Sequence, residues 1–252
     1  LAKGTSPDDI LTLYKDNGAH IFPRKMPSAL GWDLLVQLWQ RPSLLRAGTK
    51  ALRNALEGVF QQTTMRQLWD ERGIALAIPA VDMATYRAWV FKTPHDAQTN
   101  HRDDHFSIVD VCLATSAAPL FRSLAGIPQL QGGGHEVFAD GGLWANNPIL
   151  VALVEALRMQ NTGEEDIEIF ALGTCGKPEG DIIPLQALDR GLLDWKFGGE
   201  AAAVSIAAQE YAFDMIARLL KPHLKKQVQI IRFPSDKIPG ALLQYLDLDE
   251  TR

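Results

Sequence analysis

Cysteine is scarce in this sequence, whose 252 residues include two, Cys112 and Cys175. Two cysteines cannot build the disulfide framework that holds small secreted domains, so we expect a reducing compartment and a cytoplasmic protein. Long hydrophobic runs are missing as well. No stretch approaches the roughly 18 apolar residues that a membrane-spanning helix requires, so we expect no transmembrane segment.

An excess of positive charge is also absent, because the formal net charge is −5. This excludes non-specific binding to nucleic acid, which positive charge drives, and strong attraction of the whole chain to anionic membranes. The composition, 46% hydrophobic and 22% charged, is typical of a globular protein. Internal repeats, low-complexity tracts and clear domain boundaries are lacking, so residues 1–252 are predicted to form a single domain.

Helix and strand signals alternate along the chain. Ser6 and Pro7 predict the start of a helix that ends at Gly18, and Pro42 predicts separate helices on either side of it. Helical patterns cover 32–39, 44–60, 107–115, 148–159 and 201–220, and strand patterns cover 74–80, 86–91, 137–139, 167–172 and 227–233. This alternation favours an α/β sandwich with a mostly parallel central sheet.

A single carboxylate, Asp140, follows the short strand at 137–139. Functional groups in open α/β sheets gather at the carboxyl ends of strands, and the two glycines after Asp140 allow a sharp turn and close approach to a ligand. Such a carboxylate can orient or deprotonate a nearby hydroxyl. The alternative is that Asp140 only opens a turn, since Asp-Gly is a common turn signal.

Four blocks of sequence, in order, resemble patatin-like phospholipases. They are the Asp-Gly-Gly block at 140–148, the Ala-Thr-Ser-Ala-Ala-Pro block at 114–119, the Leu-Gly-Thr strand end at 170–174, and the helix opening at 4–10. The resemblance implies a three-layer α/β/α sandwich with a mostly parallel central sheet. It also implies a lipid acyl hydrolase that works with a Ser–Asp dyad, in which the aspartate deprotonates the serine directly.

In this resemblance Asp140 matches the catalytic aspartate, and Gly141 and Gly142 let it reach the site. Ser116 is expected to line the mouth of the site, and Asn147 to belong to the active-site motif and to cap the helix that follows it. No metal or organic cofactor is implied. The substrate is a glycerolipid or phospholipid at a membrane surface visited from the cytosol. Bacterial antiphage effectors activated by cyclic nucleotides carry domains of this type, and the oligomeric state stays open.

The nucleophile elbow of the family, Gly-x-Ser-x-Gly, does not occur in the printed sequence. Ser6 lacks the final glycine and is interpreted as a helix cap, while Gly132–Gly134 is interpreted as a connection rather than an oxyanion loop. We therefore expect the chain to be N-terminally incomplete and inactive on its own, because Leu1–Gly4 resembles the end of a helix. The alternative is a catalytically inactive protein that binds lipid or a regulatory partner.

Three rival sites are weaker. Cys175, in a turn after the strand at 167–172, could be a nucleophile, but a small side chain in a tight turn is the simpler interpretation. The histidines and aspartates of 95–105 have metal-ligand chemistry, but we interpret them as a solvated loop. The basic residues of the late patch could meet lipid phosphates, but we favour a helix end with a solvated face; they are Arg218, Lys221, Lys225 and Lys226.

Overall fold

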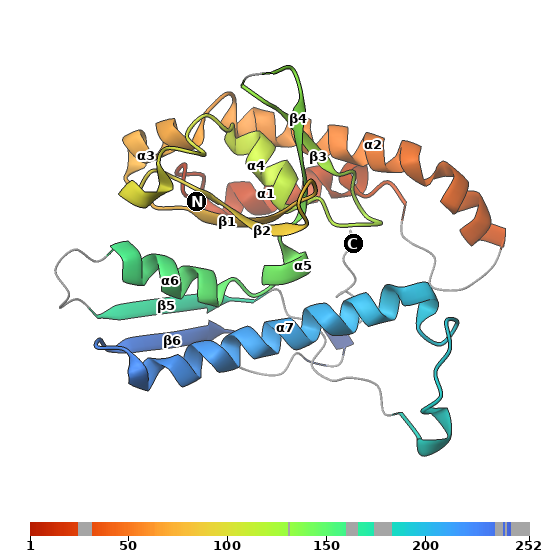
Figure 1. Ribbon diagram of the computed structural model, residues 1–252. Coiled ribbons are helices and arrows are strands. Elements are labelled where there is room, and N and C mark those ends of the chain that lie inside the picture. Colours follow the sequence, from red (N-terminus) through yellow and green to blue (C-terminus); the bar gives the residue numbers. More distant parts are fainter. Residues whose placement is uncertain are drawn as a thin grey trace. The chain divides into compact units, whose positions relative to one another are not determined.

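The computed structural model describes residues 1–24, 32–130, 132–159, 166–173, 183–234, 239 and 241–242, with only the backbone described for 32–39 and 196 (Figure 1). These residues divide between two compact units, the first within Leu1–Leu143 and the second within Trp144–Leu248. The single domain expected from the sequence stays a prediction.

The first unit combines four main helices with a four-stranded sheet. In chain order its elements are α1 (Pro7–Ile21), α2 (Trp32–Phe60), α3 (Met65–Arg72), β1 (Ala77–Asp82), β2 (Arg87–Lys92), the short η1 (Ala97–Thr99), α4 (Ile108–Thr115), β3 (Ala125–Pro128) and β4 (His135–Asp140). A four-residue helix, α5 (Gly142–Ala145), follows directly.

Two helix boundaries differ from those predicted. The Asp9 N–H donates to Ser6 Oγ at 3.1 Å, which confirms Ser6 as the cap of α1, but the helix continues through Gly18 to Ile21. α2 likewise continues through Pro42 as one helix. Glycine and proline inside a helix cost about 1 and 3 kcal/mol. Packing of α1 against α2, and of α2 against α4, outweighs that cost.

The sheet of the first unit has the order β2-β1-β4-β3, and every pair is antiparallel. The prediction of a mostly parallel central sheet is therefore wrong for the described residues. Short connections explain two of the three pairs, because β1–β2 and β3–β4 are hairpins, whereas a parallel pair requires a crossover of a dozen or more residues. The third pair, β1–β4, joins strands that are far apart in the chain. The three-layer arrangement stays a prediction.

The core of the first unit lies between this sheet and the helices. Five of the eight residues of α4 are buried, and the aromatic rings of Phe91 and Phe138 meet edge to face at 4.9 Å. Phe106 packs against Phe91 at 5.2 Å. Burial of these rings fixes β1, β2 and β4 against α4, so the end of β4 is held by a packed scaffold.

The second unit contains α6 (Ile149–Met159), β5 (Ile167–Leu172), η2 (Leu185–Ala187), η3 (Lys196–Gly198), α7 (Gly199–Leu220), η4 (Lys221–His223) and β6 (Val228–Phe233). β5 and β6 form a parallel pair, since their connection includes the long α7. Both strands lie close to their predicted positions. β5 alternates, however: Ile167 is buried, whereas Phe170 is 58% and Leu172 77% exposed, so a strand buried on both faces is not seen.

None of the helices in the described part of the chain combines the length and the apolar character needed to cross a membrane.

Candidate active site around Asp140

Asp140 is the last residue of β4 and is held through its backbone from two sides. It pairs with Ala80 of β1, where the β1–β4 ladder ends. Its N–H donates to the carbonyl of Ala117 at 3.1 Å, in the corner that follows α4. The strand end is therefore fixed to both the neighbouring strand and the helix corner.

The carboxylate of Asp140 is half-buried and accepts a hydrogen bond from the Gly142 N–H at 2.6 Å. Burial raises the pKa of Asp140, because it disfavours the charged form, and the hydrogen bond from Gly142 partly offsets this by lowering it. The net pKa lies above the ordinary value. A carboxylate with a raised pKa is a stronger base, and its pKa is closer to what general base catalysis at neutral pH requires.

Gly141 is the residue that the local packing restricts most. A Cβ atom placed there would lie 2.2 Å from the carbonyl oxygen of Pro79, a backbone atom of β1. No side chain fits at that distance, so the first glycine of the Asp-Gly-Gly block is required by contact with β1. The turn after Asp140 is thus closed against the neighbouring strand.

The Thr-Ser-Ala-Ala-Pro block forms the corner beside this turn. α4 is capped at its start by Ser107, and Ser116 is its C-cap residue. The Ser116 hydroxyl donates to the Cys112 carbonyl at 2.7 Å, while the Thr115 hydroxyl donates to the Pro79 carbonyl at 2.7 Å. Two sequence blocks that were identified separately therefore meet at the end of β4, through Ala117 and through Pro79. The sequence offered no signal for Pro79.

Asn147, the remaining predicted site residue, belongs to the second unit and is 6% exposed. Its side-chain oxygen accepts the Ile149 N–H at 3.3 Å, which confirms its expected place at the start of α6. Its side-chain nitrogen donates to the carbonyl of Glu210 in α7 at 3.1 Å. Within its unit, Asn147 joins α6 to α7.

The cysteine and metal alternatives gain no support from the described residues. Burial raises the pKa of Cys112 to about 11, which keeps it a thiol and a poor nucleophile. Cys175 lies outside the residues that the structure describes. Across the described ranges, no group of three or more histidine, cysteine or acidic side chains could hold a metal ion.

The loop of 95–105 is not simply solvated, as the sequence suggested. Asp103 is 2% exposed, and its carboxylate accepts the Lys92 N–H at 2.9 Å and a hydrogen bond from Arg102 at 2.7 Å. The Arg102 guanidinium also lies 3.9 Å from the ring centre of Trp89. This loop is therefore anchored to β2, and its acidic residue has a structural partner.

Two residues of the late basic patch, Arg218 and Lys226, are not simply exposed to solvent. Arg218 donates to Asp214 at 2.7 Å, one turn earlier on α7, and the Lys226 Nζ is buried without a hydrogen-bond partner among the described atoms. The interpretation as a solvated face is therefore wrong for Lys226. Gly132–Gly134, in contrast, lies in the connection between β3 and β4, as expected.

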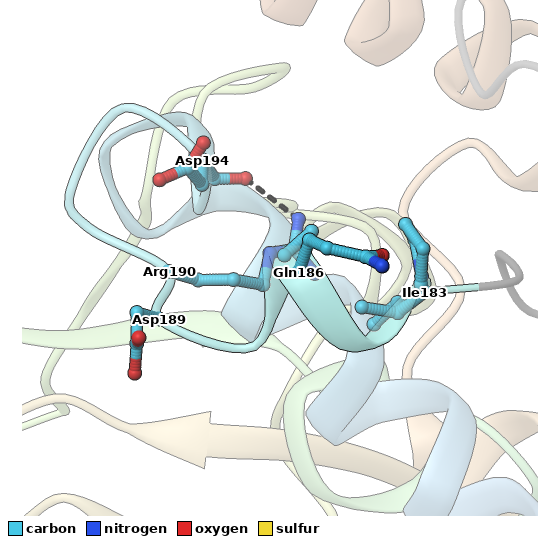
Figure 2. A pocket seen from close by; sticks show the side chains of 7 residues that line it. Ile183, Gln186, Asp189, Arg190 and Asp194 are labelled. Carbon is cyan, nitrogen blue, oxygen red and sulfur yellow. Dashed lines mark hydrogen bonds between the residues drawn. The ribbon is translucent and has the colours of Figure 1, made fainter.

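A pocket of about 460 Å³ lies in the second unit and was not foreseen from the sequence. Figure 2 shows its wall around Ile183, Gln186, Asp189, Arg190 and Asp194, all from one stretch of chain. Arg190 is already engaged, because it donates to the Asp194 carbonyl at 2.8 Å and to the Glu200 carboxylate at 3.1 Å. The pocket contains none of the predicted site residues.

Comparisons with known proteins identify the family to which the chain is similar. Residues 1–153 match the sequence model of the family described as patatin-like phospholipase. A cGAMP-activated phospholipase of Escherichia coli is 31% identical over 182 residues, 70% of this chain and 47% of that protein. Its counterpart in Vibrio cholerae is 29% identical over 236 residues, 88% of this chain and 62% of that protein.

Plant proteins are similar too: patatin-like protein 3 of Arabidopsis thaliana is 24% identical over 253 residues, 93% of this chain and 57% of that protein. The chain thus spans about half the length of the curated relatives it matches.

Proposed function

This chain belongs to the patatin-like phospholipase family, and we propose that the gene product containing it is a lipid acyl hydrolase in which Asp140 is the general base. The substrate is an acyl ester of a glycerolipid or phospholipid, reached at a membrane surface from the cytosol. No metal or organic cofactor takes part. Asp140 lies within the family match, in the Asp-Gly-Gly block that the resemblance assigns to catalysis.

One observation carries the proposal: the half-buried Asp140 carboxylate is held at a strand end by the Gly142 N–H and has a raised pKa. A free aspartate, with a pKa near 3.9, is a weak base at neutral pH. Burial moves it toward the useful range, and the fixed turn keeps the oxygen in one place. These are the properties that a base without a histidine partner requires.

In the proposed reaction the Asp140 carboxylate takes the proton of a serine hydroxyl as the serine oxygen attacks the ester carbonyl. The carbon–oxygen bond to the leaving alcohol breaks, and the proton on Asp140 passes to that alcohol. Water then attacks the acyl-serine while Asp140 takes a proton from it. The bond between the acyl carbon and the serine oxygen breaks, and the proton passes from Asp140 to that oxygen, which releases the fatty acid and restores the serine. The serine is expected in a Gly-x-Ser-x-Gly elbow, a pattern that the printed 252 residues do not contain.

Substitution of Asp140 tests the proposal in the complete gene product. Asp140→Asn keeps an acceptor for the Gly142 N–H but removes the base, so turnover of a short-chain ester should fall at least 10²- to 10⁴-fold. The matched control is Asp82→Asn, because Asp82 lies in the same sheet but accepts hydrogen bonds from Ala84 and Thr85 in a hairpin turn. If Asp140→Asn retains the wild-type rate, the assignment of the base is wrong.

A second candidate function is binding of lipid or of a regulatory partner without catalysis. It is favoured by Ser6, whose hydroxyl is engaged with Asp9 at the start of α1. The complete gene decides between the two. A serine elbow supports the enzyme, whereas a substituted serine together with retained binding to phospholipid vesicles supports the binding protein.

Control by a cyclic dinucleotide is a further part of the proposal, supported by the names of relatives in Escherichia coli and Vibrio cholerae. The complete protein should hydrolyse phospholipid faster when cGAMP is added. A rate that is high without the nucleotide and unchanged by it would contradict this control while leaving the hydrolase proposal intact.

A further inference from the structure

The β1–β4 ladder stops one residue short of Pro79. Its last pair is Ala80 with Asp140, and the Asp140 N–H points away from β1 to Ala117. Pro79 lies just beyond this pair on β1, a strand flanked by both β2 and β4. Proline has no N–H to donate, so it is seldom found inside a sheet and suits a position where a ladder ends. Pro79 is still paired with Val90 of β2, but on the β4 side the described ladder offers its carbonyl no strand partner.

The partner on that side is a side chain, the hydroxyl of Thr115, which donates to the Pro79 carbonyl at 2.7 Å. Thr115 is the last residue of α4, whose buried residues belong to the core of the first unit. α4 is further tied to α2, because Arg53 donates to Asp110 at 2.8 Å. The hydroxyl of Thr115 therefore connects the Pro79 carbonyl to a rigid element.

The same carbonyl sets the position of the turn that carries the candidate base. Gly141 lies so close to it that a Cβ atom would be 2.2 Å from the oxygen. Gly142, the next residue, supplies the N–H that holds the Asp140 carboxylate at 2.6 Å. A displacement of the Pro79 carbonyl would move Gly141, then Gly142, and finally the donor on the carboxylate.

We infer that Thr115 is a positioning residue for the Asp140 carboxylate, acting through the Pro79 carbonyl and the Gly141–Gly142 backbone. The inference rests on the proposed role of Asp140 as the base. The Thr115 hydroxyl hydrogen-bonds to the Pro79 carbonyl and not to the Asp140 carboxylate, so any effect on Asp140 is indirect. Its role predicts an effect on the rate of the chemical step and on the ionisation of Asp140, and not on substrate binding.

The experiment compares Thr115→Val, which removes the hydroxyl at nearly constant shape, with Thr115→Ser, which retains it. In the complete gene product, Thr115→Val should lower kcat about 10- to 100-fold, as small misplacements of catalytic groups do, with KM within about twofold. The acid limb of the kcat profile should move to higher pH, because a weaker Gly142 hydrogen bond leaves the pKa of Asp140 higher. Thr115→Ser should keep both kcat and the acid limb close to those of the wild type.

A control for plain loss of stability is Thr93→Val. Thr93 is fully buried in the same unit, and its hydroxyl accepts the Leu76 N–H at 2.8 Å near the start of β1. This variant should lower the unfolding temperature without moving the acid limb. Hydrogen exchange adds a readout that is independent of activity: the peptide spanning 140–143 should exchange faster in Thr115→Val than in Thr93→Val.

The outcomes separate the two proposals. If Asp140→Asn is inactive while Thr115→Val keeps its kcat, its acid limb and slow exchange at 140–143, the positioning role is wrong and the base assignment stands. If Thr115→Val and Thr93→Val behave alike, Thr115 is only structural and the inference is overturned. If Asp140→Asn is active, the proposed function fails, and the catalytic role of Thr115 fails with it.

Discussion

Two strands of this molecule end at a glycine, and their ends are built differently. β4 in the first unit is followed by Gly141, where a Cβ atom would lie 2.2 Å from the Pro79 carbonyl oxygen, too close for any side chain. β5 in the second unit is followed by Gly173, where a Cβ atom would lie 3.5 Å from the Phe233 carbonyl oxygen, the nearest atom among the described residues other than its chain neighbours. Both glycines belong to blocks that resemble the same family, but the packing requires glycine only in the first unit.

The residues before the two glycines also differ in burial and in hydrogen bonding. Asp140 is half-buried and held by defined hydrogen bonds, whereas Leu172 is largely exposed in the described part of the second unit. A motif match alone does not separate a restricted position from a permissive one. The contact with a neighbouring backbone does, and it singles out the turn after Asp140 as the better supported site.

The largest expected loss of stability comes from a substitution at the end of β4. Gly141→Ala forces a methyl group into the Pro79 carbonyl, so the free energy of unfolding should fall by about 3 kcal/mol or more, at the upper end for overpacking. Gly173→Ala should change it by less than about 0.5 kcal/mol, because the added methyl group makes an ordinary contact. Urea denaturation of both variants measures the difference. Equal stability would show that the turn can move away from β1.

A smaller loss of stability is expected when a partly or fully buried arginine is replaced, and one arginine in each unit, Arg122 and Arg232, allows the comparison. Arg122 is buried in the first unit, has no carboxylate partner among the residues that the structure describes, and donates to the carbonyls of Ile21 and Gly48 at 3.4 and 3.2 Å. Burial lowers the pKa of this guanidinium, with a small opposing effect from Tyr14. Arg122→Met should reduce the free energy of unfolding by about 1–3 kcal/mol, since it removes the buried side-chain donor from the Ile21 carbonyl at the end of α1.

The matched variant in the second unit is Arg232→Met. Arg232 is more exposed and donates to the Asp214 carboxylate at 2.7 Å, so its loss should cost less than about 1 kcal/mol. Thermal unfolding of the two variants ranks the costs. A larger cost for Arg232→Met would mean that the second unit depends on this ion pair more than its exposure suggests.

Local chemistry in the sequence was enough to predict several elements of both units. Ser6 and Ser107 mark helix starts, and the strand patterns near β5 and β6 were recognised from their apolar residues. α3 was missed although its signals are present, a Thr64–Gln67 capping box and a left-handed Gly73 at its end. That helix could have been predicted from residues close together in the chain.

Features that depend on distant residues could not be predicted in this way. The strand β3 is four residues long and includes a glycine and a proline, and it is stabilised by its pairing with β4 and by burial of Ala125 and Ile127 in the core. The antiparallel order of the sheet and the contact of Gly141 with Pro79 likewise join segments far apart in the chain. The sequence located Asp140 at a strand end, but not the neighbours that hold it there.

The smallest expected effect is the pH dependence of the stability change caused by replacing one aspartate in each unit, Asp140 in the first and Asp214 in the second. Asp140 has a raised pKa, so its folded form favours the protonated state, and its ionisation destabilises the fold at pH values above that pKa. Asp140→Asn should therefore be slightly more stable than the wild type at pH 8. The gain should shrink as pH falls through the folded pKa and vanish near the unfolded value of about 3.9.

Asp214 in the second unit should show the opposite sign. Burial alone would raise the pKa of Asp214, but hydrogen bonds from Arg218 and Arg232 outweigh it and hold the pKa below the ordinary value. The ionised form therefore stabilises the fold above the unfolded pKa, and this contribution is lost as pH falls through the lower, folded pKa. Asp214→Asn should be less stable than the wild type at pH 8, with both effects below about 1 kcal/mol because solvent screens the two groups. Thermal unfolding from pH 8 to pH 4 measures both, and a common sign for the two variants would contradict the assigned environment of one aspartate.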